Sequence, residues 1–211
     1  MNEPLVVTAP AVTPVSLDEV KAHLRVDDDT EDALLTAMIA GAANAAELYL
    51  GRSLITQTLR LTLDRWPVNG VGPDVTFDGP WINGPRAVEL ARPPVQSIAS
   101  VTVYDEDDQA SVVDPTVYRL ANGSNDRARL VLRKGQAWPT GTRITDAIEI
   151  DYVAGYGDTT ADAPEPIRQG LLALIGVWYE HRDGAGWASQ GSPLPVGAVS
   201  LWRPFRLIGL V

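Results

Sequence analysis

The hydrophobic period of this sequence changes twice along the chain, and this change limits the possible fold more than any other feature. Between about residues 30 and 50, apolar side chains recur at i, i+3, i+4 and i+7, as in an amphipathic helix. Between residues 55 and 153 they alternate with polar ones, as half-buried strands require. After residue 157 the helical period returns. The pattern predicts two helical segments separated by a β segment.

Start and stop residues support three helices. Ser16 can cap a short first helix, and Gly51 is suited to end a longer one over 30–50. A third helix is predicted over 165–182, where Pro166 falls in the first turn and its missing N–H costs nothing. This helix is apolar around much of its circumference, so we expect other elements to cover it.

These segments predict an α+β fold. Its expected form is a helical core, made of the N-terminal helices plus helix 165–182, with an inserted small antiparallel β unit and an extended C-terminal tail. The expected parts are 1–54 (helical core, first part), 55–157 (inserted β unit), 158–182 (last helix of the core) and 183–211 (linker and partner-binding tail). Loop 65–86 is rich in proline and glycine, so we expect it to project from the β unit.

The residues available for chemistry are few. The chain has no cysteine, which excludes thiolate metal sites and thiol catalysis, and its histidines, His23 and His181, lie far apart. The acidic run Asp27–Asp32 has an aspartate where a calcium loop needs glycine, and is better explained as helix capping. No intact phosphate-binding or nucleophile motif occurs. We therefore predict no catalytic residue, no cofactor, no metal and no enzymatic activity.

Charge and hydropathy restrict the partners. A net charge of −10 disfavours binding to the nucleic-acid backbone, which requires clustered lysine and arginine. No run of about 18 uncharged apolar residues occurs, so no membrane span is expected. The aromatic C-terminal end must either return to its own core or bind a partner. Its candidate partner-binding residues are Trp202, Arg203, Phe205, Arg206 and Leu207.

Several short motifs, in order along most of the chain, resemble one protein family. They are SLITQTLRL at 53–61, RPPVQSI at 92–98, QAWP at 136–139, YVAGYG at 152–157, APEPIR at 163–168 and WRPFR at 202–206. Together they resemble the head–tail connector family of tailed phages, prophages and gene transfer agents, whose members are also called adaptors or head-completion proteins.

The resemblance implies a structural subunit that forms a ring of about twelve copies beneath the portal of a phage or gene transfer agent particle, assembled in the bacterial cytoplasm. The ring would link the portal to the next neck protein and let DNA pass through its lumen without specific binding. A ring that closes head to tail needs two different surfaces on each subunit. Our candidates for the subunit interface are Met38, Ala42 and Ala46 in helix 30–50, and Leu171 and Trp178 in helix 165–182.

Two alternatives stay open. The chain could be another neck protein, such as a stopper or a tail terminator. It could also be a small carbohydrate- or peptide-binding β module that uses Trp66 and Trp81, because tryptophans in proline- and glycine-rich segments often lie at interfaces.

Overall fold

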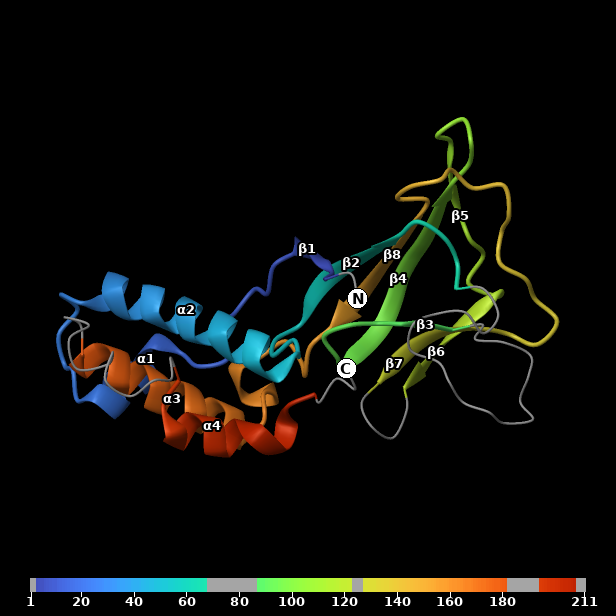
Figure 1. Ribbon diagram of the computed structural model, residues 1–211. Helices are drawn as coiled ribbons and strands as arrows, with labels where there is room; N and C mark the ends of the chain where they lie inside the picture. The colour runs from blue at the N-terminus through green and yellow to red at the C-terminus, as the bar shows by residue number, and fades with distance from the viewer. Residues whose placement is uncertain (1–2, 68–86, 123–126, 182–193, 208–211) are drawn as a thin grey trace. The chain divides into compact units, whose positions relative to one another are not determined.

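The computed structural model describes residues 3–67, 87–122, 127–181 and 194–207 of the chain (Figure 1). It contains two compact units. The β unit comprises Met1–Ala9 and Gln57–Ala154, and the helical unit comprises Pro10–Thr56 and Gly155–Val211. Most of the expected projecting loop, residues 68–86 with Trp81, lies outside the described residues, as does segment 182–193.

The larger sheet of the β unit has five antiparallel strands in the order β1-β2-β8-β4-β5. Along β2 the leucines Leu59 and Leu61 face the interior, and Leu59 lies opposite the fully buried Tyr152 of β8. The strands span Leu5–Thr8 (β1), Gln57–Leu63 (β2), Ile148–Ala154 (β8), Val95–Tyr104 (β4) and Ala110–Val112 (β5). The alternation seen in the sequence therefore places one face of the sheet in a core.

A second sheet completes the β unit. Its three antiparallel strands lie in the order β3-β7-β6 and span Ala87–Glu89, Ala128–Leu132 and Tyr118–Asn122. Both sheets contribute to one hydrophobic core, for example through Val101 of β4 and Leu130 of β7. At its margin Trp66 stacks on Trp138, with ring centroids 3.9 Å apart and an interplanar angle of 4°.

The helical unit is organised around α3, which contacts each of the other three helices described here. The helices span Leu17–Leu24 (α1), Asp32–Leu50 (α2), Glu165–Glu180 (α3) and Val196–Trp202 (α4), with short 3-10 helices at Thr160–Asp162 (η1) and Arg203–Phe205 (η3). Local sequence explains the helix ends. Ser16 and Glu19 form a capping box at the start of α1, and Gly51 ends α2 in the left-handed conformation.

The expected fold, a helical core with a small inserted β unit and an extended tail, is wrong. The β strands form two sheets around a hydrophobic core of their own, and β1, from the N-terminal end of the chain, belongs to the larger sheet. The C-terminal segment is not extended either. Residues 196–205 are helical because Ala198 and Trp202, one turn apart, are both buried against the helical core.

Candidate interaction surfaces

The C-terminal tryptophan is a core residue of its own chain. Trp202 is fully buried, and its indole Nε1 donates a hydrogen bond to the carbonyl of Ile167, at 3.0 Å. The indole fills a space that exists because residue 170 is glycine, where a Cβ atom would overlap the ring. Tyr49 of α2 lies on another side, with ring centroids 5.9 Å apart. Trp202 thus fastens α4 to α3 and α2.

The residues that follow Trp202 run along the C-terminal end of α2. The Arg52 Nε donates to the carbonyl of Phe205 at 2.5 Å, and the Leu207 amide donates to the carbonyl of Leu50 at 2.9 Å. The guanidinium carbon of Arg206 lies 4.9 Å from the centre of the Tyr49 ring. Phe205 and Leu207 are half-buried, whereas Arg203 and Arg206 are exposed. Of the predicted tail residues, the two arginines are the ones whose side chains face solvent.

The outer face of α2 carries no charge. The exposed residues of this helix are Ala33, Leu34, Thr36, Ala37, Ala40, Gly41, Asn44 and Leu48, and Leu48 is 64% exposed. Helices at a protein surface usually carry charged side chains on the solvent side. Here the charged residues of α2 are half-buried at its ends. Asp32 pairs with Lys21 at 2.9 Å, and Glu47 accepts a hydrogen bond from the Leu54 amide at 2.8 Å.

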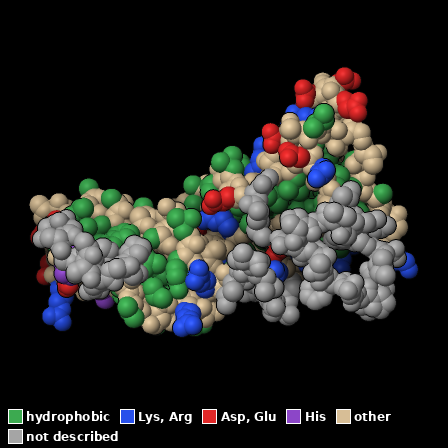
Figure 2. Space-filling model, in the orientation of Figure 1, with side chains coloured by type: hydrophobic (Ala, Val, Ile, Leu, Met, Phe, Trp, Pro, Cys, Tyr) green, Lys and Arg blue, Asp and Glu red, His purple; other side chains and the backbone are tan. Residues whose placement is uncertain are grey.

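The apolar character of α2 is strong enough to resemble a membrane span. Of the helices in the described part of the chain, α2 alone is long and apolar enough to cross a bilayer, by length and composition only. One side of it is nevertheless buried in the core of the helical unit, through Leu35, Ile39, Ala42, Ala46 and Leu50. In Figure 2 the surface over α2 is coloured mainly green and tan. Such a surface is typical of an interface.

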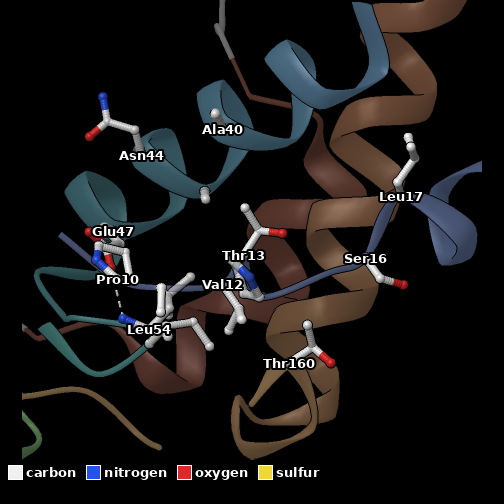
Figure 3. A pocket seen from close by; sticks show the side chains of 14 residues that line it. Pro10, Val12, Thr13, Ser16, Leu17, Ala40, Asn44, Glu47, Leu54 and Thr160 are labelled. Carbon is white, nitrogen blue, oxygen red and sulfur yellow. Dashed lines mark hydrogen bonds between the residues drawn. The ribbon is translucent and has the colours of Figure 1, made fainter. Parts of the chain in front are cut away.

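A groove lies beside this helix. Its volume is about 620 Å³, and Figure 3 shows Val12 and Thr13 of the segment before α1 lying near Ala40 and Asn44 of α2. The lining residues are mostly apolar: Pro10, Ala11, Val12, Thr13, Pro14, Ser16, Leu17, Ala40, Ala43, Asn44, Glu47, Leu54, Ile55 and Thr160. The one lining carboxylate, Glu47, accepts a hydrogen bond from the Leu54 amide (dashed line in Figure 3). The groove is suited to apolar side chains.

The outer face of α4 is also free of charge. Its exposed residues are Val196, Gly197, Ser200 and Leu201, and Val196 is 77% exposed. Among the described helices, α3 contacts both α2 and α4, and it separates them in Figure 1. The helical unit therefore has two uncharged outer faces on two sides of α3.

The exposed face of α1, unlike those of α2 and α4, carries charged side chains. Asp18, His23 and Arg25 are exposed there, so this side is solvated in the ordinary way. Glu19 pairs with Arg168 of α3 and also accepts a hydrogen bond from the backbone N–H of Ser16, at 2.8 Å. That backbone hydrogen bond, more than the nearby arginine, lowers the pKa of the Glu19 carboxyl.

The predicted interface residues lie deeper than expected. Ala42, Ala46 and Leu171 are fully buried inside the helical unit, while Met38 and Trp178 are half-buried. The predicted residues lie on the inward stripe of each helix because that stripe is the most apolar. The outer faces were missed, although a signal was present: residues 33–46 contain no charge at any helical position. The α4 face was missed because it follows a stretch rich in glycine and proline.

The sugar-binding alternative finds no support at Trp66. Its side chain is 8% exposed and its ring stacks on Trp138, so a sugar could not stack on that face. Trp81 lies outside the described residues. Within the described ranges, no three His, Cys, Asp or Glu side chains lie close enough together to hold a metal ion.

Comparison with known proteins points to one family. A model of phage gp6-like head–tail connector proteins matches residues 14–109. No curated protein matches the sequence. Three solved chains match all of this chain and 98% of their own length. They belong to the neck of an empty gene transfer agent (GTA) particle computed with C6 symmetry (25% identity, TM-score 0.75), the virion of a native GTA particle (24%, 0.76) and the neck of a native GTA particle computed with C12 symmetry (23%, 0.75).

The family match and the whole-length structural match agree with the order of the short motifs found in the sequence. They confirm the resemblance drawn from those motifs: residues 14–109 match the model of phage gp6-like head–tail connector proteins, and the whole chain is similar to chains of gene transfer agent particles.

Proposed function

We propose that this chain is a structural, non-enzymatic adaptor in the neck of a phage or gene transfer agent particle, where its copies form a ring beneath the portal. The observation that carries the proposal is the whole-length likeness to chains in GTA necks, which were computed with six-fold and twelve-fold symmetry. Rotational symmetry of this kind requires identical copies around an axis.

The mechanism is geometric. The ring presents one surface to the portal and another to the next neck component, and so joins two assemblies that do not fit each other directly. DNA passes through the lumen without binding, because a net charge of −10 per copy repels phosphates within a Debye length of about 8 Å at physiological salt. Passage is then fast, since no phosphate contact has to be broken.

The portal contact is assigned to the C-terminal segment. Arg203 and Arg206 are exposed, and the backbone between them is held against α2 by the Arg52–Phe205 hydrogen bond. Exposed guanidinium groups on such a held backbone favour carboxylates, to which they can form two parallel hydrogen bonds. Phe205 and Leu207 border the arginines and would supply the apolar part of the contact, while Trp202 sets the position of the whole segment.

Co-sedimentation with portal-bearing heads that lack the connector tests the proposal. The full-length chain should pellet with these heads and should not pellet with heads that lack the portal. An Arg203→Glu/Arg206→Glu variant should bind about tenfold more weakly or worse, because carboxylates would face carboxylates. The matched control is Arg65→Glu/Arg119→Glu, which makes the same charge change at exposed positions of the β unit and should bind normally.

The same experiment separates the neck alternatives. A stopper or a tail terminator would bind isolated tails, or connector-filled heads, and not the bare portal. Binding of the unmodified chain to tails alone would overturn the adaptor proposal.

A further inference from the structure

We propose that neighbouring copies in the ring are joined by α4 of one copy, whose outer face packs into the groove beside α2 of the next copy. This contact rests on the proposed ring and adds the two surfaces that build it. One surface is the α4 face, made of Val196, Gly197, Ser200 and Leu201. The other is the α2 groove, lined on its helix side by Ala40, Ala43 and Asn44.

Within the described helical unit, the exposed large apolar side chains lie on α4, on α2 and in the groove beside it. On the α4 face, Val196 is 77% and Leu201 is 38% exposed. In the groove, Val12 is 38% exposed and lies beside the uncharged outer side of α2. The exposed side of α1, by contrast, carries Asp18, His23 and Arg25. Burying that side would leave charged groups without water, whereas burying the other two removes mainly apolar area, and the one groove carboxylate, Glu47, accepts a hydrogen bond from the Leu54 amide.

The shapes of the two surfaces also match. Val196 and Ser200 are one helical turn apart on the same side of α4, and Leu201 lies next to them, so they form a ridge. Ala40, Ala43 and Asn44 are short and leave the helix side of the groove open. Two helices that pack through such a ridge and short facing side chains have axes about 8–10 Å apart. The α4 ridge of one copy could therefore approach α2 of the next copy closely.

A second copy of this chain, and not another protein, is the occupant that symmetry favours. A ring that closes head to tail needs two different, complementary surfaces on each subunit. The helical unit has two such surfaces, and α3 lies between the helices that carry them. Similar chains occur in necks computed with C6 and C12 symmetry, where each copy has a neighbour on either side.

Cysteine cross-linking in assembled particles tests this contact directly, because the chain has no cysteine of its own. The test variant carries Ala40→Cys and Leu201→Cys. The matched control carries Ala22→Cys and Leu201→Cys, since Ala22 is an exposed alanine on α1. Particles assembled with either variant are treated with a short bis-maleimide and separated on a denaturing gel.

We expect the test variant to give a ladder of covalent oligomers that extends beyond the dimer, and each single-cysteine variant to stay monomeric. The control pair should give at least tenfold less cross-linked product. Two results in particles that contain the ring would overturn this contact and leave the adaptor function standing. One is a ladder formed by the control pair, and the other is a dimer formed by the Ala40→Cys variant alone. Particles in which the chain is absent from the neck would overturn both the contact and the adaptor function.

A charge exchange provides a second readout that does not depend on a cross-linker. Ala40→Glu should lower the amount of ring recovered on heads about tenfold or more, because it places a carboxylate against the apolar α4 face. Leu201→Lys should do the same. The two changes together should restore part of the assembly, since the new charges face each other. Ala22→Glu should have no effect, and equal loss with Ala22→Glu would count against the contact.

Discussion

The central strands of the larger sheet and the helical unit carry different side chains on their outer faces. On the solvent side of β2, β8 and β4 in the larger sheet, polar side chains pair across the strands, whereas the edge strands β1 and β5 expose apolar ones such as Leu5 and Val112. Arg60 of β2 lies opposite Asp151 of β8, and its Nε is 2.7 Å from the Asp151 carboxylate. Its Nη1 is 2.9 Å from Glu149, which also accepts a hydrogen bond from the Tyr104 hydroxyl, at 3.2 Å. These contacts tie β2, β8 and β4 together.

The same polar character continues in the turn after β4, where Asp105, Glu106, Asp107 and Asp108 are all exposed. The helical unit instead has uncharged outer faces on α2 and α4. Its charged contacts, such as Lys21–Asp32 and Glu19–Arg168, lie at α1 and the helix ends. The difference indicates that the face of β2, β8 and β4 is suited to solvent, and that the outer faces of α2 and α4 are suited to contact with protein.

The largest effect is expected from Trp202→Ala, which would empty a fully buried site in the helical unit. We expect a loss of about 3–5 kcal/mol in the free energy of unfolding, measured by chemical denaturation. Deleting residues 202–211 should be at least as damaging, because it removes the same side chain. If either change left the unfolding midpoint intact, Trp202 would not be part of the core, and the C-terminal segment would be free to act as a separate tail.

A pair of glycine substitutions tests how closely Trp202 packs in the core of the helical unit. Gly170→Ala should cost about 1–3 kcal/mol, because the new methyl group would overlap the Trp202 indole. Gly197→Ala is the matched control. No atom lies within 4 Å of its Cβ position, and alanine favours the helix, so a gain of up to about 1 kcal/mol is expected in monomeric protein. Equal losses at both positions would argue against close packing at Gly170.

A pH series tests the charged side of the helical unit. The pKa of Glu19 is lowered in the folded chain from its usual value of 4.5. Its contribution is therefore complete above about pH 4.5 and disappears as the pH falls through the lower, folded pKa. Glu19→Gln should cost about 1 kcal/mol or less at pH 7, and this difference should shrink below pH 4.5. A difference that grew on acidification would contradict this assignment.

The smallest effect is expected on the sheet. Asp151→Asn weakens an ion pair that is partly open to water, so we expect a loss of at most about 1 kcal/mol, which decreases as salt is added. Ring formation on heads should be unchanged. A defect in assembly with normal stability would mean that the face of β2, β8 and β4 is itself a contact surface, and the contrast between the two units would fail.

Periodicity predicted the individual elements better than their organisation. The helix cap at Ser16, the end of α2 at Gly51 and the separate strands that contain Leu59 and Tyr152 all follow from local patterns, and the structure contains them. The element β1 was missed because Leu5–Thr8 is a short apolar run without alternation. Its membership of the sheet depends on pairing with β2, more than 50 residues away.

The C-terminal segment was misinterpreted for a related reason. Its glycines and prolines suggested an extended tail, but the docking of Trp202 depends on the missing side chain of Gly170 in another helix. No pattern local to residues 196–205 contains that information. The same limitation applies to the predicted interface residues, which lie on inward stripes, since periodicity identifies the apolar stripe of a helix and not which other helix will cover it.

Electron cryomicroscopy of particles that contain this chain tests the central claim most directly. We predict a closed, rotationally symmetric ring of this chain directly beneath the portal, with the helical units of neighbouring copies in contact through α4 and the α2 groove. A ring located at the tail tip, copies located in the capsid shell, or a ring whose neighbours meet through the charged sheet face would contradict it.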